Sequence, residues 1–452
     1  MQDKNQKIIT RFPPSPTGPL HIGNVRTALF NYFFARQNGG QFIVRVEDTD
    51  KVRSKKEYEL GMLDSLKWLG LSRDGQLWHQ SERVEIYKKY LRKLIDEGKA
   101  YVSQETEGDN KEVIRFKNPN KVVTFTDLIR GEISFDTTEL KDFIIARNIN
   151  EPVYHLSVVV DDFQSGVTHV IRGDDHVSNT PRQILIGEAL GVPRPVYAHL
   201  PLILAKDRSK LSKRKHGQSV SLDYYQKLGY LPGAIVNYLS LVGWNPGTDK
   251  EIFTIDELIK TFDITQVQKG GAIFDPVKLD WLNKEHMKRL PKNTINKEIY
   301  NRLKNNDIIS KSEKINDKKF VEKISETIFN HISKWGDIDT ITGEGELSYF
   351  FEEPQYEAEK LLWKESSPDI SKKHLMWIIN QLDKIQNDSF DSADTAKNLI
   401  FDYATENGKG EVLWPLRLAL SGKEKSPDPF TLIYILGKSE SISRISNAIK
   451  KL

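Results

Sequence analysis

The fold of this chain is decided by one stretch near its start, Arg11-Phe-Pro-Pro-Ser-Pro-Thr-Gly-Pro-Leu-His21-Ile-Gly23-Asn24. The apolar residues from Ile8 to Phe12 predict a short strand that runs into this Pro- and Gly-rich stretch. After His21, apolar residues recur at helical spacing until Asn38-Gly39-Gly40 ends the helix. The stretch is therefore a loop between a strand and a helix, and it places His21 at the helix N-terminus.

A second strand is predicted at Gln41 to Val46, which completes a βαβ unit. The free backbone N–H groups and the positive end of the helix dipole stabilise an anion where the loop meets the helix. Ligands of such sheets bind beyond the carboxyl ends of the strands, and Arg11, Glu47 and Asp48 lie at or near those ends. We expect a nucleotide site here. The alternative is that the prolines only shape a surface loop and that His21 only caps the helix.

A second informative segment is basic and reads Lys210-Leu-Ser-Lys213-Arg214, with Lys206 and Arg208 before it and Lys215-His216-Gly217 after it. Taken alone, such a run is a solvated face or a phosphate-binding patch. Its lysines and glycine also suit a mobile loop that closes on a triphosphate and reopens to release product.

The rest of the first half alternates between helical and strand patterns. Two amphipathic stretches, 58–69 and 84–95, predict helices. Residues 153–160 and 169–172 predict strands in which the nucleotide fold resumes. Asn179-Thr180-Pro181 predicts a helix start with a capping side chain and Pro in the first turn.

Between these parts lies a segment of different character. Residues 104–112 are polar, and 114–143 read as short strands joined by turns at 117–120 and 130–131. We interpret 100–152 as an insertion into the nucleotide fold. After the basic segment the spacing is mostly helical, and after residue 306 it is helical throughout.

Length and composition limit the class of protein. A chain of 452 residues needs more than one domain, and 38% hydrophobic with 29% charged residues is a globular balance. The absence of Cys excludes disulfides and thiolate zinc sites. Neither a membrane-spanning run nor a secretory h-region is visible, so we expect a cytoplasmic protein without a membrane partner. We also expect a monomer. The net charge of +3 is too small to identify a nucleic-acid binder.

The two segments together resemble the HIGH and KMSKS signatures of class I aminoacyl-tRNA synthetases, written here His21-Ile-Gly-Asn24 and Lys210-Leu-Ser-Lys-Arg214. The wider pattern is similar to the bacterial-type glutamyl-tRNA synthetase family, and it extends over nearly the whole chain. Its other matching segments are Pro14–Gly23, Phe42–Asp50, Val170–His176, Leu231–Tyr238, Leu241–Trp244 and Trp414–Gly422.

This resemblance implies an α/β Rossmann-type class I catalytic domain with an inserted α+β acceptor-binding domain, followed by all-α stem-contact and anticodon-binding domains. The corresponding boundaries are catalytic 1–99 and 153–218, insertion 100–152, stem-contact 219–305 and anticodon-binding 306–452. It implies ligation of L-glutamate to tRNA-Glu through a glutamyl-adenylate, with ATP and Mg²⁺ and with tRNA needed for adenylate formation. Because the insertion is abbreviated and lacks the cysteine module of some relatives, we expect no zinc and no other protein-bound metal.

The resemblance also assigns residues by position. Catalytic roles fall on His21, Gly23, Lys210 and Lys213. ATP contacts fall on Ser15, Thr17, His21, Gly23, Asn24, Asp175, His176, Lys210, Leu211, Ser212, Lys213 and Arg214. Glutamate contacts fall on Arg11, Pro13, Ser15, Glu47, Tyr154, Ser157 and Arg172. The chemistry agrees, because the planar guanidinium of Arg binds a carboxylate with two parallel hydrogen bonds.

Several alternatives stay open at this point. Arg172 could pair with Asp174 or Asp175, Tyr154 could be a core aromatic, and at Ser157 many relatives carry a different contact residue. A small nucleotidylyltransferase would leave the helical half unexplained, and a tRNA-modifying paralogue lacks an anticodon region. A glutaminyl enzyme would carry a β-barrel C-terminus, and a non-catalytic tRNA-binding protein would not need both signature loops.

The tRNA specificity is a further expectation. Relatives that discriminate tRNA-Glu from tRNA-Gln place an Arg where the last anticodon base is read, and the stretch 333–342 contains none. We therefore expect an enzyme that also charges tRNA-Gln with glutamate. The alternative is that Arg289, Arg302 or Arg417 performs the discrimination.

Overall fold

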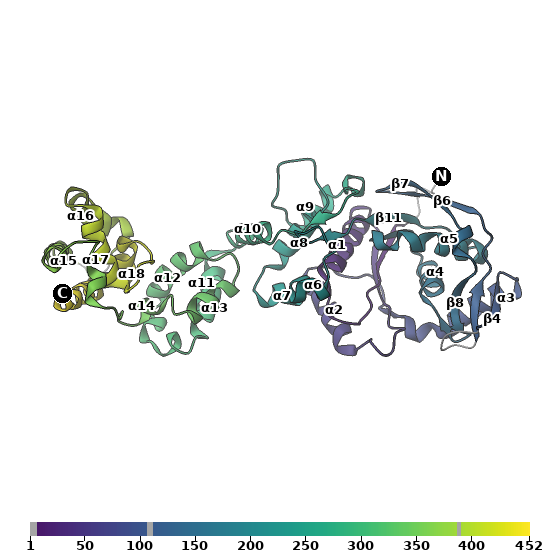
Figure 1. Cartoon of the computed structure of the whole chain (residues 1–452), viewed down its shortest axis with the longest axis horizontal. Coiled ribbons are helices and arrows are strands. Elements are labelled where there is room, and N and C mark those ends of the chain that lie inside the picture. The colour runs from purple at the N-terminus through teal and green to yellow at the C-terminus, as the bar shows by residue number, and fades with distance from the viewer. Residues whose placement is uncertain (1–6, 106–111, 387–389) are drawn as a thin grey trace. The chain divides into compact units, whose positions relative to one another are not determined.

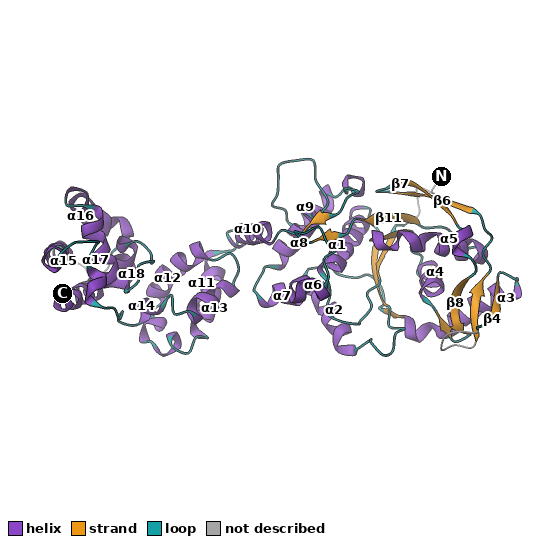
Figure 2. Cartoon of the chain, viewed as in Figure 1, coloured by secondary structure: helices purple, strands orange, loops and turns teal. Residues whose placement is uncertain are grey.

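The computed structural model describes residues 7–105, 112–386 and 390–452. The chain forms two compact units, residues 1–286 and 287–452 (Figure 1). We call them unit 1 and unit 2. Figure 2 shows that the strands of the described residues all lie in unit 1, whereas unit 2 consists of helices and loops.

Unit 1 is built on parallel strands: β1 (Ile9–Phe12), β2 (Gln41–Val46), β3 (Trp78–His79), β10 (His169–Gly173) and β11 (Val196–Leu200). The first three form one sheet in the order β1-β2-β3, and β10 pairs with β11 in another. The two sheets adjoin, because the backbone N–H of Thr168 donates to the carbonyl of Ile9 at 3.0 Å. The carboxyl ends of these strands therefore share one edge.

Helices cover both faces of these strands: α1 (Ile22–Gln37), α2 (Lys56–Trp68), α3 (Val84–Asp96), α4 (Tyr154–Gln164) and α5 (Thr180–Leu190). Residues on nearly every side of α1 are buried, because the strands cover one side and the helices α8 (Pro232–Leu241) and α9 (Ile255–Thr261) cover another (Figure 1). On the opposite face, apolar residues of α4 and α5 pack on Val170 and Tyr197. The predicted Rossmann-type βαβ unit is confirmed.

The strand predicted at 153–160 is wrong, because these residues belong to α4. The β-branched run Val158-Val159-Val160 favours a strand by propensity, which tertiary packing readily overrides. In the helix, Leu156 and Val160 lie one turn apart and are both fully buried. The predicted start of α5 is right, but Asn179 does not cap it, since its side chain contacts His176 Nδ1 at 3.2 Å instead.

The segment 100–152 contributes to two sheets. An antiparallel sheet contains β4 (Ala100–Gln104), β5 (Glu112–Phe116), β8 (Phe143–Asn148) and β9 (Glu151–Pro152). The hairpin of β6 (Val122–Asp127) and β7 (Gly131–Asp136) instead extends the β10–β11 sheet, with Asp127 opposite Tyr197. This hairpin brings Asp127 to the edge of the nucleotide fold. Part of the predicted polar segment, residues 106–111, lies outside the described residues.

The remaining elements of unit 1 are β12 (Ile203–Leu204), β13 (Ala272–Ile273), α6 (Lys213–His216), α7 (Leu222–Lys227) and α10 (Pro276–Met287). Residues of α7 to α10 belong to the same apolar core as α1. The division into units thus falls inside 219–305, the segment that the sequence assigns to one stem-contact domain. The five-part domain division remains a prediction.

Unit 2 is helical over its described residues: α11 (Lys292–Lys304), α12 (Lys318–His331), α13 (Gly336–Gly343), α14 (Ser348–Phe351), α15 (Pro368–Asp383), α16 (Ala393–Glu406), α17 (Lys409–Ser421) and α18 (Pro429–Lys451). α18 packs against α15, α16 and α17 and bends at Gly437, which has a φ of 81°. The buried Arg444 of α18 donates to the carbonyls of Tyr349 and Leu420, which ties α14 and α17 to it. The expected all-α C-terminal region is confirmed, without a β-barrel among the described residues.

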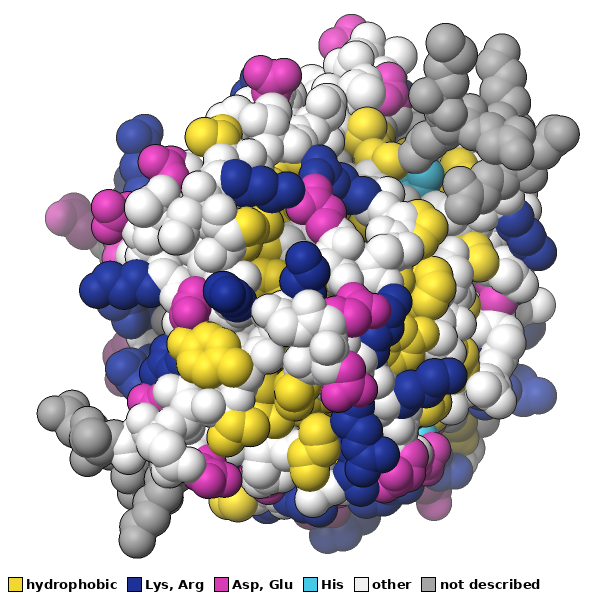
Figure 3. Space-filling view, turned by 90° about the vertical axis from the view of Figure 1, so that its right-hand side faces the viewer, with side chains coloured by type: hydrophobic (Ala, Val, Ile, Leu, Met, Phe, Trp, Pro, Cys, Tyr) yellow, Lys and Arg dark blue, Asp and Glu magenta, His cyan; other side chains and the backbone are white. Residues whose placement is uncertain are grey.

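One face of the molecule carries mixed charges. Figure 3 shows one face of the molecule, where basic and acidic side chains are interspersed and apolar side chains show between them. Within the residues that the structure describes, no helix is long and apolar enough to cross a membrane. The same residues contain no group of three or more His, Asp or Glu side chains placed to hold a metal ion.

Candidate active site

The first signature segment lies at the start of α1, beside the chain that follows the second one. His21 is the N-cap of this helix, and its Nδ1 accepts a hydrogen bond from the backbone N–H of Gly23 at 3.0 Å. The backbone of His21 bridges to Ser221, and the N–H of Leu222 donates to the carbonyl of Leu20 at 2.9 Å. The chain that follows the basic segment is therefore fixed beside the His21 loop.

The local structure gives a reason for glycine at position 23. A Cβ added at Gly23 would lie 3.2 Å from Nδ1 of His21, tighter than an ordinary contact. A larger residue would therefore push the imidazole from its position at the helix N-terminus. We conclude that Gly23 keeps His21 in place, whether or not a nucleotide approaches it.

The basic segment is anchored at Leu211, and the lysine before it is exposed. Leu211 is buried, and its N–H donates to the carbonyl of Ile203 at 3.1 Å. Lys210 Nζ lies 3.0 Å from Asp175 Oδ2, and about half of each side chain is exposed. Lys213 begins the short helix α6. The segment thus presents the Lys210 ammonium beside Asp175.

Arg172 is a buried guanidinium whose hydrogen-bond partners among the described residues are all neutral. It is 5% exposed and donates to Gln183 Oε1 at 2.8 Å, to Thr180 Oγ1 at 2.7 Å and to His199 Nε2 at 3.2 Å. Burial lowers the pKa of Arg172 from its ordinary value. A buried cation without a counter-ion is costly. Arg172 is therefore suited to bind an anionic ligand.

The pairing of Arg172 with Asp174 or Asp175 is not observed. Asp174 Oδ2 lies 2.7 Å from Arg130 Nη2, and Asp175 pairs with Lys210. Both neighbouring carboxylates are therefore committed to other cations.

The tautomer of His199 is fixed by Asp127. His199 Nδ1 lies 2.7 Å from Asp127 Oδ2, and both side chains are fully buried. The carboxylate accepts a hydrogen bond from the Nδ1–H group, so Nε2 carries no proton and accepts from Arg172. Burial lowers the pKa of His199, so that the ring is neutral at pH 7. Asp127, on the β6–β7 hairpin, thereby orients Arg172 through His199.

Arg11 lies beside a second acid–base cluster. Its Nε lies 3.3 Å from Asp162 Oδ2, and Arg45 Nη1 lies closer to the same carboxylate, at 2.7 Å from Oδ1. Arg45 also reaches Glu47 Oε1 at 3.2 Å. Burial raises the pKa of Glu47, and the charge of Arg45 opposes this shift without cancelling it. Besides the Arg45–Asp162 pair, the cluster contains a loosely paired guanidinium, on Arg11, and a second carboxylate, on Glu47.

Tyr154, the first residue of α4, connects these groups. Its hydroxyl lies 3.1 Å from His176 Nδ1. Burial raises the pKa of Tyr154, and the charges of Arg172, Glu47 and Arg11 all act on its phenol. Burial and the charge of Arg172 lower the pKa of His176 to about 4, so its ring is neutral at pH 7. The structure thus brings Arg11, Glu47, Tyr154 and Arg172 into one neighbourhood.

The other predicted residues differ in accessibility. Ser15, Thr17, Asn24 and Arg214 are exposed, whereas Pro13 and Ser212 are partly buried. Ser157 is 1% exposed, and its hydroxyl donates to the carbonyl of Tyr154 at 3.3 Å within its own helix. The Ser157 hydroxyl is therefore hydrogen-bonded to the backbone of its own helix. This arrangement gives no support to the predicted contact of Ser157 with glutamate.

Comparison with known proteins covers both units. Residues 7–109 and 103–281 match the family described as tRNA synthetases class I (E and Q), catalytic domain, and residues 298–449 match an anticodon binding domain. The glutamate–tRNA ligases of Carboxydothermus hydrogenoformans and Aquifex aeolicus are each 39% identical to the chain, over 97% and 99% of it and 99% of their own length. The chain belongs to the glutamate–tRNA ligase family of class I tRNA synthetases.

A solved structure of this family supports the same assignment. The glutamate tRNA ligase from Elizabethkingia meningosepticum, crystallised in complex with its amino acid, superposes with a TM-score of 0.86. It is 31% identical, and the match covers 99% of this chain and 100% of that one. Glutamate–tRNA ligase relatives therefore match this chain in both units. The readings as a single-domain nucleotidylyltransferase and as a paralogue without an anticodon region are excluded.

Proposed function

We propose that this chain ligates L-glutamate to tRNA-Glu in two steps, through a glutamyl-adenylate. An oxygen of the glutamate α-carboxylate attacks the α-phosphorus of ATP, and pyrophosphate leaves. A hydroxyl of the terminal tRNA ribose then attacks the activated carbonyl carbon, and AMP leaves. The observation that carries the proposal is the buried Arg172 guanidinium, whose described partners are all neutral.

Glutamate has two carboxylates and one ammonium, and the site offers matching groups. Arg172 and Arg11 supply guanidinium donors for the carboxylates, and the Tyr154 hydroxyl supplies a neutral donor. Glu47 supplies a carboxylate for the ammonium. Its raised pKa is consistent with this role, because an arriving cation would stabilise the ionised form.

The ATP phosphates need positive charge and positioning rather than a nucleophile. We assign His21 and the N-terminus of α1 to the phosphates, with Gly23 holding His21 in place. Lys210 and Lys213 bring ammonium groups on the basic loop, and Asp175 and His176 face the ribose and base. Mg²⁺ enters with ATP as part of the substrate and neutralises phosphate charge.

For tRNA we assign the insertion to the acceptor arm and the helical unit 2 to the anticodon. The match of residues 298–449 to an anticodon binding domain supports the second assignment. Phosphate contacts from dispersed Lys and Arg position the tRNA, and exposed bases of the anticodon loop provide the specificity.

The proposal is tested by charging purified tRNA-Glu with labelled glutamate and by ATP–pyrophosphate exchange with and without tRNA. We expect glutamate to be attached in an ATP-dependent reaction, and exchange to require glutamate and tRNA together. Aspartate and glutamine serve as control amino acids. Efficient charging with glutamine, or exchange that does not depend on glutamate, would overturn the assignment.

We further propose that the enzyme charges tRNA-Gln with glutamate as well. In the stretch 333–342, Lys334 is paired with Asp337 at 3.0 Å rather than free to read a base. Two of the three alternative readers are also engaged, because Arg302 lies 2.8 Å from Glu298 and Arg417 donates to the carbonyl of Pro427 at 3.1 Å. Charging both tRNAs in parallel should give kcat/KM values within about tenfold of each other. A preference for tRNA-Glu well beyond this range would show that a discriminating residue exists.

Asp127 should act on glutamate affinity through His199. Replacing Asp127 by Asn removes the charge that fixes the His199 tautomer, so the hydrogen bond from Arg172 weakens. We expect the KM for glutamate to rise roughly fivefold, equivalent to about 1 kcal/mol, with the KM for ATP unchanged. Asp136→Asn at the end of the same hairpin is the control, since its carboxylate bonds only Thr138 among the described residues. Equal effects of both substitutions would contradict the positioning role.

A further inference from the structure

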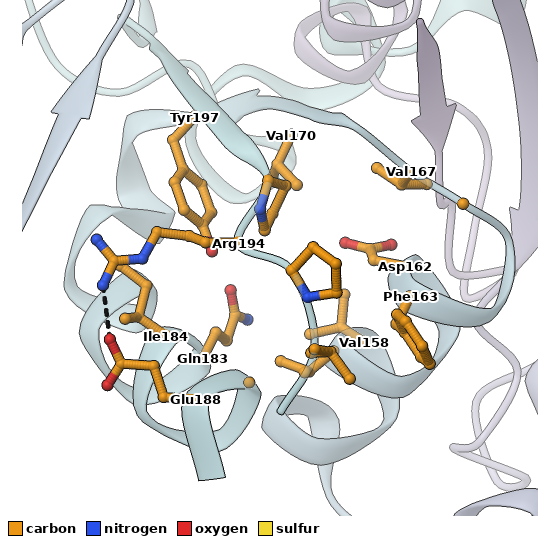
Figure 4. A pocket seen from close by; sticks show the side chains of 16 residues that line it. Val158, Asp162, Phe163, Val167, Val170, Gln183, Ile184, Glu188, Arg194 and Tyr197 are labelled. Carbon is orange, nitrogen blue, oxygen red and sulfur yellow. Dashed lines mark hydrogen bonds and ion pairs between the residues drawn. The ribbon is translucent and has the colours of Figure 1, made fainter. Parts of the chain in front are cut away.

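A cavity of about 270 Å³ lies between α4 and α5 (Figure 4). The loop residues Gly166 and Val167, just before β10, and Val192 to Pro195, just before β11, form part of its lining. It therefore lies at the amino ends of these strands, whereas Arg172 is near the carboxyl end of β10. The residues assigned to glutamate are absent from its described lining. We call this cavity the back pocket.

Gln183 presents an unused donor to the back pocket. The residue is 5% exposed, and its Oε1 is identified by the hydrogen bond from Arg172, because a guanidinium can only donate. Its Nε2 is buried and has no hydrogen-bond partner in the described structure. A buried amide left without a partner is costly, so the site favours a molecule that brings an acceptor.

Tyr197 adds a second polar group to the same space. Burial raises the pKa of Tyr197 to about 12, so its hydroxyl is neutral and can donate. Figure 4 shows the polar ends of Tyr197 and Gln183 directed toward the same hollow. The two side chains come from β11 and α5, and the packed core fixes both.

The remaining lining is apolar or carries charges that are already paired. Val158, Val170 and Ile184 form apolar walls, and the carboxylate of Asp162 excludes an anion. At the rim, Arg194 is neutralised by Glu188 at 2.7 Å. An apolar cavity of about 150 Å³ holds a benzene molecule, so this larger one has room for a bicyclic ring. The lining therefore suits a flat, neutral molecule with a carbonyl acceptor.

We propose that the back pocket binds a neutral bicyclic heteroaromatic lactam and that its occupation changes the affinity for glutamate. Two lining residues connect the pocket to the site. Gln183 bonds Arg172 at 2.8 Å, and Asp162 lies between Arg11 and Arg45. A ligand that binds the Gln183 amide acts on Arg172, and one that also contacts Asp162 acts on Arg11. These are the two arginines that we assign to glutamate. The coupling is reciprocal, so glutamate must change the affinity for the ligand by the same factor.

The binding claim stands by itself, whereas the effect on glutamate rests on the proposed function. We use quinolin-2-one as the probe and titrate it calorimetrically into the full-length chain, with and without glutamate. Millimolar probe should give saturable binding with one site per chain. Glutamate should change the probe affinity about threefold or more. No heat of binding at millimolar probe, or heat that does not saturate, would overturn the proposal.

Variants locate the site. Val167→Phe fills the mouth of the pocket and should weaken probe binding about tenfold or more. Val122→Phe is the matched control, because Val122 is 62% exposed on β6 and lies outside the pocket. Gln183→Glu keeps an acceptor for Arg172 but loses the N–H donor, so it should also lose the probe. Unchanged probe binding in both pocket variants would place the site elsewhere and overturn the proposal.

The two proposals fail in different ways. If the chain charges tRNA but the probe does not bind, the back pocket proposal falls and the ligase assignment stands. If the probe binds and responds to Val167→Phe while no tRNA is charged with glutamate, the pocket stands and the ligase assignment falls.

Discussion

Replacing Arg172 by Ala is expected to lower kcat/KM for glutamate by roughly 30- to 5,000-fold, mainly through a higher KM. The physical reason is that the substrate carboxylate would stay buried without its charged partner, which costs about 2–5 kcal/mol. Gln183, Thr180 and His199 would in addition lose a common donor. Steady-state charging at varied glutamate concentration measures the effect.

Two further variants separate charge from geometry at this position. Arg172→Lys keeps the charge but not the planar set of donors, so it should recover only part of the loss. Arg73→Ala removes an exposed Arg from the same unit and should leave the KM for glutamate unchanged. A wild-type glutamate KM in Arg172→Ala would show that another residue holds the carboxylate.

The parts of the fold that the sequence predicts correctly are those in which local pattern and packing agree. The strands at Ile9–Phe12 and Gln41–Val46 and the helix between them have apolar spacing that matches their burial. Residues 153–160 fail because three consecutive Val residues favour a strand locally, while the neighbouring elements require a helix. The requirement for a helix comes from packing against these neighbours, and it cannot be read from the local sequence.

The site residues could likewise be predicted only in part from the sequence. Arg11 and Arg172 are predicted from positions that match a family motif, and the structure places both near Glu47 and Tyr154. The Asp162 carboxylate between Arg11 and Arg45 could not be predicted, because it lies 151 and 117 residues away from them. The pair of Asp127 and His199 is separated by 72 residues. Contacts over such separations depend on how the strands and helices are arranged in space. Asp162 lies on α4, so a prediction that makes 153–160 a strand cannot give the direction of its side chain.

The second large effect concerns the basic loop. Replacing Lys213 by Ala should depress kcat by about 10²–10³-fold and leave the affinity for tRNA nearly intact. We expect this because a cation aimed at the charge that develops on the phosphates stabilises the transition state more than the ground state. The KM values for ATP and glutamate should therefore change much less than kcat. Single-turnover formation of the adenylate measures the chemical step directly.

Lys215→Ala is the matched control for this prediction, since it removes the same charge from the same short helix α6, two residues further along. If the loop acted only through its overall positive charge, the two substitutions would have similar effects on kcat and on its salt dependence. A specific role predicts a large loss for Lys213→Ala and a small one for Lys215→Ala. A loss of tRNA affinity parallel to the loss of turnover in Lys213→Ala would instead assign this lysine to tRNA binding. The kcat ratio of the two variants therefore decides whether Lys213 acts on the reacting phosphates.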